Sequence, residues 1–354
     1  MFELDIGPLP VNAMAQPFDE FPPIDGEKEA DAMIAYLSDY FTVQNEVAII
    51  EQNYANVDFD SVNKDMLYMQ LRNCLPAKMQ SQISIDDFAS MESIKEKFAA
   101  VKQTVSAFIK RIWDVIKNFL VGLVNKAEKN YRQAVALREK IRGMKNPKMK
   151  PTKVTHALSA LASGFKGSHG VPRNGVLDTF KVLKAYDPAD EAKHIIAGIE
   201  SMLKEGKTAI EVRDTLHKGL SKVFGSMMIE GKERFFYVFD SDANIVYNSH
   251  TGVFGFEHFA FRDTAKMDFP MENIEGLETE APEAAIAAFE YLRDKSLILK
   301  LESDILGLAK VDAPNAGDLQ KLATFALSFF KANMQYNNAL GQGALAVANL
   351  VHDA

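Results

Sequence analysis

The chain has 354 residues, of which 47% are hydrophobic and 25% are charged, and its net charge is −8. This composition excludes a disordered chain and leaves enough apolar residues for a sizeable core. A single cysteine, Cys74, excludes an internal disulfide framework and any site that needs several cysteine ligands. The first residues are acidic and lack the basic segment of a signal peptide, and no apolar run reaches the ~18 residues that span a bilayer. We therefore expect a soluble protein without stable membrane insertion.

The net charge conceals a strong segregation along the chain. Residues 1–92 contain 17 acidic and 4 basic residues, residues 93–153 contain 4 and 16, and the remainder contains 27 and 20. These segments carry net charges of −13, +12 and −7, which sum to −8. Either the basic segment meets an external polyanion, or the acidic remainder of the same chain neutralises it. Neither alternative implies base-specific recognition.

The first part of the chain predicts an arm followed by two helices. Five prolines in residues 1–25 exclude a regular helix and predict an extended arm. Residues 26–92 predict an acidic helical region, in which Asp25 caps a first helix and a shorter second helix follows Ser61.

The most prominent pattern is one long amphipathic helix from Ser93 to Gly143. Large apolar residues recur every three or four positions, as on one face of a helix. Ser93 and Glu96 form a capping-box pattern at its start, and Gly143 ends it. Because the helix would be roughly 75 Å long, we expect a kink at Gly122. We assign residues 93–150 to this basic helix and its hinge, and we regard the helix as the element around which the chain is organised.

Residues 151–354 predict a C-terminal helical domain with an inserted sheet. Three helices are expected between residues 175 and 224, and an antiparallel pair of long helices begins at Pro282. Aromatic and β-branched runs at residues 226–268 predict two to four antiparallel strands that cover the helices with one face. The expected fold class is therefore mainly α, a long central helix and helical bundle with a small antiparallel β-hairpin sheet in the C-terminal domain.

The sequence offers no recognisable catalytic or cofactor site. His169, Arg173 and Asn174 share a Gly-rich loop that would suit an anion or catalytic site, but no strand precedes it and no Gly-Lys-Ser/Thr ends it. Three residues of the predicted hairpin region lack the close spacing of a structural zinc site: His250, Glu257 and His258. We therefore expect no enzyme, no metal and no cofactor, and an enzyme with a site around the His169 loop is kept as an alternative.

The order of the segments carries a family resemblance. An acidic helical head is followed by the tripeptide Ser90-Met91-Glu92, by a Trp-containing basic helix with the sequence IKRIWDVIKNFL, and by a helical domain with a Phe-rich hairpin. This layout resembles the internal head proteins, or inner virion structural proteins, of large-genome tailed bacteriophages. Several members of that family carry an amino-terminal propeptide, which a prohead protease removes after a small residue, any residue and glutamate. The resemblance thus implies that residues 1–92 are a possible propeptide, cut between Glu92 and Ser93.

The resemblance also implies a function. It implies a non-enzymatic virion protein that is packaged inside the capsid near the DNA and ejected with the genome, located in the virion interior and, during assembly, in the host cytoplasm. The implied partners are packaged DNA without sequence preference, other virion proteins and the prohead protease. A membrane-interacting protein acting on the host envelope is the first alternative, because the aromatic residues around Trp113 and the nearby lysines also suit an interfacial helix. The expected nucleic-acid contacts are Lys110, Arg111, Lys117, Lys126, Lys129, Arg132, Lys140, Arg142, Lys145, Lys148, Lys150 and Lys153.

Overall fold

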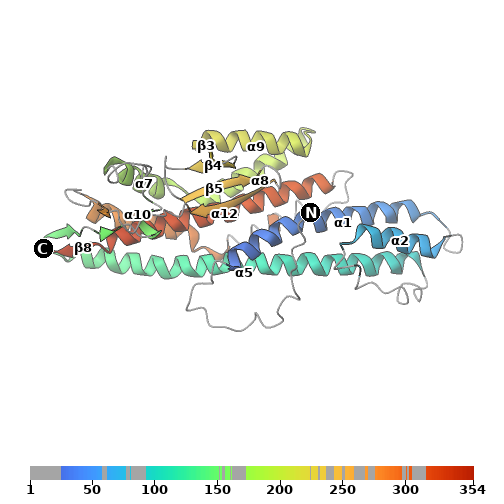
Figure 1. The fold of residues 1–354 in the computed structure, drawn as a ribbon, viewed down its shortest axis with the longest axis horizontal. Coiled ribbons are helices and arrows are strands. Elements are labelled where there is room, and N and C mark those ends of the chain that lie inside the picture. Colours follow the sequence, from blue (N-terminus) through green and yellow to red (C-terminus); the bar gives the residue numbers. More distant parts are fainter. Residues whose placement is uncertain are drawn as a thin grey trace.

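The protein is an elongated, mainly helical molecule (Figure 1). The structure, a computed structural model, describes residues 25–57, 62–76, 80, 93–150, 152–153, 156–159, 161, 173–223, 225–229, 232–236, 243–248, 252–258, 268–269, 276–296, 300, 303–304 and 316–354. Three long helices follow its long axis: α1 (Asp25–Tyr54), α5 (Ile94–Arg142) and α12 (Ala316–Ala348). The mainly helical fold class expected from the sequence is confirmed.

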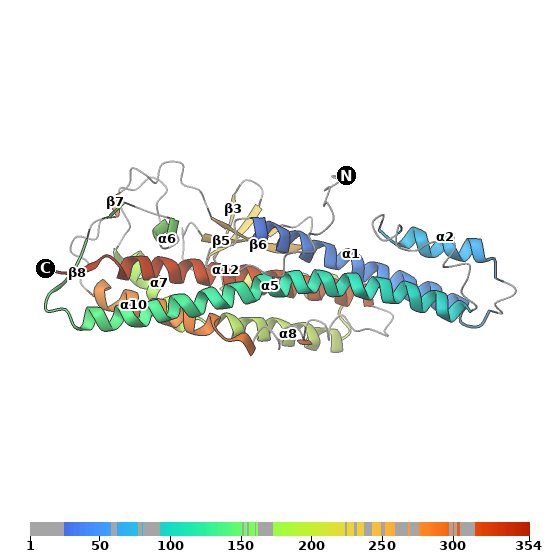
Figure 2. The same cartoon turned by 90° about the horizontal axis from the view of Figure 1, so that it is seen from below.

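Helix α5 forms as the capping pattern predicts. The hydroxyl of Ser93 accepts a hydrogen bond from the Glu96 amide (3.2 Å), and the Glu96 carboxylate accepts one from the Ser93 amide (3.3 Å). The helix continues for 49 residues, and Figure 2 shows it as one rod without a sharp bend, so the kink expected at Gly122 is absent. Neighbouring helices cover its apolar face along its length, which outweighs the ~1 kcal/mol that a glycine costs inside a helix.

Helix α1 packs antiparallel along the first half of α5. The ring of Tyr40 stacks on that of Phe108 with 5.6 Å between their centroids, and Tyr54 lies 6.5 Å from Phe98. The short helix α2 (Lys64–Cys74) packs beside the end of α1, where the hydroxyl of Tyr54 donates a hydrogen bond to Gln70 (3.0 Å). The two helices of the acidic region are thus part of the folded body.

Helix α1 also packs antiparallel to α12. The ammonium group of Lys331, which is fully buried, donates a hydrogen bond to the carboxylate of Asp31, and Asn45 donates one to the side chain of Gln320 (2.8 Å). The Lys331 ammonium also lies 5.2 Å from the centre of the Phe119 ring of α5. A single buried lysine of α12 therefore contacts both α1 and α5.

Helix α12 is the most enclosed element of the fold. Every residue from 322 to 341 is buried, because α12 is surrounded by α1, α5, α6 (His156–Ser159), α8 (Pro188–Lys204), α9 (Ala209–Val223), α10 (Leu277–Leu292) and the sheet. Together with α7 (Arg173–Ala185), these helices form the bundle expected for the C-terminal part. The long helix that organises the packing is therefore α12, and α5 lies along the outside.

Helix α10 runs antiparallel to α12, as expected for the last helix pair, and the amide of Asn337 donates a hydrogen bond to the Ala288 carbonyl oxygen (3.2 Å). The helix begins at Leu277 rather than at Pro282. Two glutamates in its first turn, Glu278 and Glu280, favour the earlier start because they oppose the positive end of the helix dipole.

The sheet has four antiparallel strands in sequential order, β3 (Gly225–Ile229), β4 (Lys232–Phe236), β5 (Ala243–Asn248) and β6 (Val253–His258). Phe254 of β6 is buried and meets Phe325 and Phe329 of α12 edge to face, at centroid distances of 5.0 and 5.2 Å. The prediction of two to four strands that cover the helices with one face is thus confirmed.

Two short strands lie where the sequence suggested a hinge. Strand β1 (Pro147–Met149) pairs antiparallel with β8 (Val351–Asp353), and β2 (Thr152–Lys153) pairs with β7 (Asp268–Phe269). The pairing partners are far away in the sequence, so local patterns give no sign of these strands. Most buried apolar residues of the described segments form one continuous core. The division of the chain at residues 25, 92 and 150 stays a prediction.

Candidate nucleic-acid interface

The outward side of α5 and the segment that follows it are rich in exposed basic residues. Between residues 94 and 150, ten basic side chains are exposed, against three acidic ones. The acidic ones are Glu96, Asp114 and Glu139. The basic ones are Lys95, Lys110, Arg111, Lys129, Arg132, Lys140, Arg142, Lys145, Lys148 and Lys150.

The helical repeat explains this arrangement. Ile112, Ile116 and Leu120 are buried on the face of α5 that contacts other helices. Residues about two positions away project to the opposite side, because each residue turns the helix by about 100°. The side chains of Lys110 and Lys129, two positions from the buried Ile112 and Ala127, therefore face away from the core.

Nine of the twelve predicted contact residues are exposed. Lys117 and Lys126 are half-buried and interact with other groups of the protein. Lys153 belongs to β2, and its side chain lies outside the described part of the structure. The exposed residues are therefore the stronger part of the predicted set, and their contact with nucleic acid stays a prediction.

Acidic groups of the same chain neutralise part of this surface. Arg132 pairs with Glu128 (2.9 Å), and Arg142 pairs with Glu283 of α10 (3.1 Å). Hydrogen bonds from Arg132 and Arg293 hold the pKa of Glu128 below its usual value. Towards the start of α5, Lys102 pairs with Glu51 of α1. The second alternative from the charge count, neutralisation within the chain, is therefore realised for some of the basic side chains.

Seven exposed lysines between residues 94 and 150 have no ion-pair partner among the described residues: Lys95, Lys110, Lys129, Lys140, Lys145, Lys148 and Lys150. Lys148 and Lys150 flank Met149 of β1, and alternate residues of a strand project to the same side. The positive surface of α5 thus continues past the end of the helix, so an open cationic surface is left after the internal ion pairs are formed.

The aromatic side of α5 is not available to a membrane in this fold. Trp113 and Leu120 are buried, and Phe108 and Phe119 pack against the same core. Among the described residues, no helix is both long and apolar enough to cross a bilayer. The residues that suggested an interfacial membrane helix therefore serve the packing of α5 on its neighbours.

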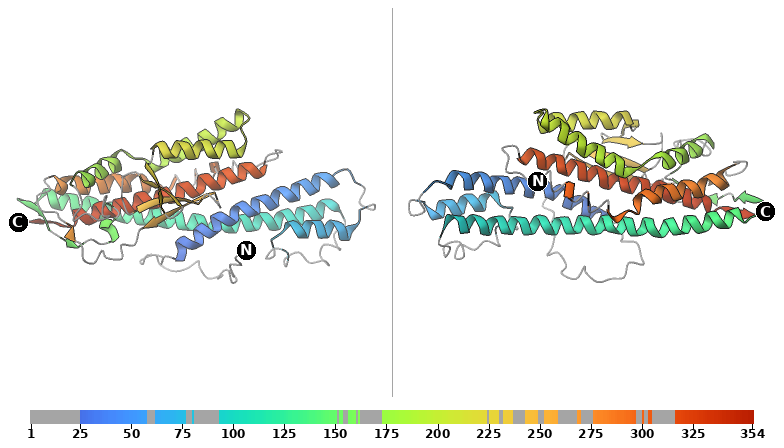
Figure 3. Two further views of the ribbon diagram at one scale, coloured as in Figure 1. Left: turned by 45° about the horizontal axis from the view of Figure 1, so that its top comes forward. Right: turned by 180° about the vertical axis from the view of Figure 1, so that it is seen from behind.

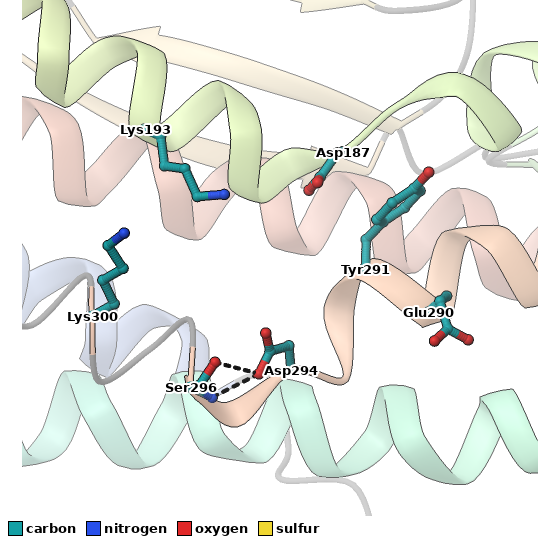
Figure 4. Close-up of a pocket in the computed structure, with 7 residues that line it drawn as sticks. All are labelled: Asp187, Lys193, Glu290, Tyr291, Asp294, Ser296 and Lys300. Atoms are coloured by element: carbon teal, nitrogen blue, oxygen red, sulfur yellow. Dashed lines mark hydrogen bonds between the residues drawn. The ribbon is translucent and has the colours of Figure 1, made fainter.

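One pocket of the described part does not bring reactive groups together. It has a volume of about 430 Å³ and lies between α8, α10 and the segment after α10 (Figure 4). The hydroxyl and amide of Ser296 donate hydrogen bonds to Asp294 (2.7 and 2.9 Å), which is an ordinary turn arrangement. Lys193 and Lys300 point into the opening from different segments, and Glu290 points away from it. We see no nucleophile paired with a base here.

The sequence-based candidates for a catalytic or metal site fall largely outside the described residues. This holds for His169 and His250, and for the side chains of Arg173 and Asn174 at the start of α7 and of His258 in β6. Among the residues that are described, no three His, Cys, Asp or Glu side chains are grouped so that they could hold a metal ion. The alternative of an enzyme at the His169 loop is thus untested.

The described part is a helical rod that exposes a cationic surface along α5 and β1. Residues 82–168 match the family model of the phiKZ-like phage internal head proteins. The matched segment contains all of α5 and the tripeptide Ser90-Met91-Glu92.

This match supports the interpretation of the chain as an internal head protein of a large phage, which is a structural protein of the virion. It also indicates a location inside the phage head. The resemblance seen in the sequence is thereby confirmed. No curated protein and no solved structure matches the chain.

Proposed function

We propose that this protein is a non-enzymatic component of the phage head that is packaged against the DNA and contacts its phosphates without sequence preference. One observation carries the proposal, namely the ten exposed basic side chains against three acidic ones between residues 94 and 150. DNA would be bound through the charge of its backbone, which is the same for every sequence.

The dimensions of α5 suit such a contact. A helix of 49 residues is about 75 Å long at 1.5 Å per residue. Over that length, duplex DNA presents a negative charge about every 1.7 Å of its axis. Each phosphate neutralised by a lysine or arginine releases condensed counterions, so binding should weaken steeply as salt is added.

The test is a titration of the full chain against two duplexes of unrelated sequence at salt concentrations between about 50 and 200 mM. We expect equal affinities for both duplexes and a linear fall of log K with log salt. The variant Lys110→Gln, Lys129→Gln, Lys140→Gln should lower the slope by about 0.9 for each phosphate that is no longer neutralised. The matched control Lys193→Gln, Lys204→Gln, Lys218→Gln removes three exposed lysines of α8 and α9 and should leave the slope unchanged. Absence of binding, or equal effects of both variants, contradicts the proposal.

We further propose that the chain is matured by a cut between Glu92 and Ser93 and enters the host with the genome. The tripeptide itself lies outside the described residues. Support comes from the start of α5, where Ser93 and Glu96 satisfy each other's polar groups without help from residues upstream. A new amino group at Ser93 would still lie beside the Glu96 carboxylate, so the helix would keep its cap.

Mass spectrometry of purified virions checks the cut. The expected result is a non-tryptic peptide that begins at Ser93, together with loss of tryptic peptides that span Glu92. Intact spanning peptides in mature particles would refute the maturation step and leave the DNA contact unaffected.

A further inference from the structure

We infer that the protein binds duplex DNA with one end of the rod rather than along its whole length. This inference rests on the proposed DNA contact and names the part of the surface that makes it. We call this part the basic end and define it by its exposed cations: Lys129, Arg132, Lys140, Arg142, Lys145, Lys148 and Lys150.

The exposed charges are distributed unevenly along α5. Residues 129–150 expose the seven cations of the basic end and only one acidic side chain, Glu139. Residues 94–128 expose three cations, Lys95, Lys110 and Arg111, and two acidic side chains, Glu96 and Asp114. The excess of positive charge on the helix is therefore largely confined to its second half.

The neighbouring helices increase this difference. Helix α1 lies beside the first half of α5 and exposes Glu29, Asp39 and Glu46. With a screening length of about 8 Å at physiological salt, these carboxylates oppose the approach of DNA to the nearby cations. Helix α1 and the first half of α5 therefore form a surface whose net charge is close to neutral or negative.

At the basic end two glutamates of α10 are already engaged in ion pairs, and Asp353 of β8 is bound by backbone amides. Helix α10 lies beside the second half of α5, where Glu283 pairs with Arg142 (3.1 Å) and Arg138 (3.7 Å), and Glu280 pairs with Lys184 of α7. The lysines further along have no such partners among the described residues. The negative groups of α10 therefore cancel some arginine charge and leave the lysines of the basic end to an external anion.

The last lysines of the basic end are held in place by β-pairing. Strand β1 pairs with β8, and the Lys150 amide donates a hydrogen bond to the Leu350 carbonyl oxygen (2.9 Å). The carboxylate of Asp353 accepts hydrogen bonds from the amides of Asn146 (3.0 Å) and Lys145 (3.4 Å). These backbone contacts reduce the conformational entropy that would be lost on binding.

The positions of the helices make this end distinct. Figure 3 shows β1 and β8 at one tip of the molecule, and the end of α1 and the start of α2 near the other tip. Binding through the basic end would leave α1 and α2 away from the DNA. The DNA would meet the second half of α5 together with β1.

Two matched variants test the inference, each removing three exposed cations from residues 94–150. We expect Lys145→Gln, Lys148→Gln, Lys150→Gln to weaken binding to a duplex at least about 10-fold and to lower the salt slope by about 3. We expect Lys95→Gln, Lys110→Gln, Arg111→Gln to change affinity less than about 2-fold. Circular dichroism and thermal melting of both variants verify that they are folded.

The outcomes separate the two proposals. If both variants lose the same affinity for duplex DNA, or if the variant in the first half of α5 loses more, the inference of binding through the basic end is overturned. The proposed DNA contact itself would still stand. If the unmodified chain fails to bind either duplex, the DNA contact itself is refuted. A larger loss of affinity in the variant of the basic end supports both the DNA contact and its location.

Discussion

Helices α5 and α12 are both long, yet their surroundings are opposite. Helix α5 buries one stripe and exposes its charged side, whereas α12 is buried at every position from 322 to 341. The regular amphipathic repeat of α5 is the stronger sequence signal, because such a repeat marks a helix with one side in water. A strong helical pattern therefore identifies the edge of this fold, and its centre has a weaker one.

The largest expected difference between the two helices concerns their apolar packing. Phe329 of α12 is buried against Phe254 of the sheet, so Phe329→Ala should lower the free energy of unfolding by about 3–5 kcal/mol. Asn125→Ala on the exposed side of α5 should change it by less than about 0.5 kcal/mol. Urea denaturation followed by circular dichroism measures both. Similar values for the two variants would mean that α12 is not the centre of the fold.

A glycine in each helix gives the next comparison. A Cβ atom at Gly343 of α12 would lie 2.5 Å from the Ala157 carbonyl oxygen and 2.6 Å from a Leu161 carbon, whereas one at Gly122 of α5 meets nothing within 4 Å. Gly343→Ala should therefore destabilise the protein by about 1–3 kcal/mol through overpacking. Gly122→Ala should stabilise it by up to about 1 kcal/mol, because alanine favours a helix. Melting temperatures that move in the same direction would contradict this difference.

The smallest expected difference in stability is between two ion pairs of α1, one with a buried lysine of α12 and one with an exposed lysine of α5. Asp31→Ala leaves the fully buried ammonium of Lys331 without its carboxylate and should lower the free energy of unfolding by about 2 kcal/mol. This value is below the usual cost of breaking a buried pair because the Asp31 side chain is 41% exposed. Glu51→Ala breaks an exposed pair with Lys102 and should cost about 0–1 kcal/mol. The double variant Asp31→Ala, Lys331→Met should recover most of the loss in chemical denaturation. A double variant as unstable as Asp31→Ala would show that the unpaired charge is not the cause.

The features that the sequence predicted depend on local signals. The capping box of α5, the helices before residue 224 and the four strands with their aromatic face all follow from residues close to one another in the chain. The exposed position of six predicted cations on α5 (Lys110, Arg111, Lys129, Arg132, Lys140 and Arg142) also follows, because the apolar stripe fixes which side of the helix faces water. Local periodicity was therefore sufficient to predict the exposed cationic side of α5.

What the sequence did not predict depends on distant partners. Strands β1 and β2 exist because residues 351–353 and 268–269 come beside them. The buried α12 carries polar residues, including Lys331, Asn333 and Asn337, that a simple polarity pattern places in water. Their partners lie on other helices: Asp31 for Lys331 and the Ala288 carbonyl for Asn337. Such pairings form only when the helices are assembled.

The packing of α1 bears on how the particle could process this protein. Leu37, Phe41 and Val47 of α1 lie in the same core as α5 and α12. Hydrolysis of the peptide bond after Glu92 would therefore yield a nicked but associated molecule, in which α1 stays clamped to its neighbours. The acidic segment before the cut would leave the head only after a separate step, such as unfolding during ejection or further proteolysis. Native mass spectrometry of the nicked protein should give the mass of a complex of both fragments. Two separate fragment masses would disprove the association.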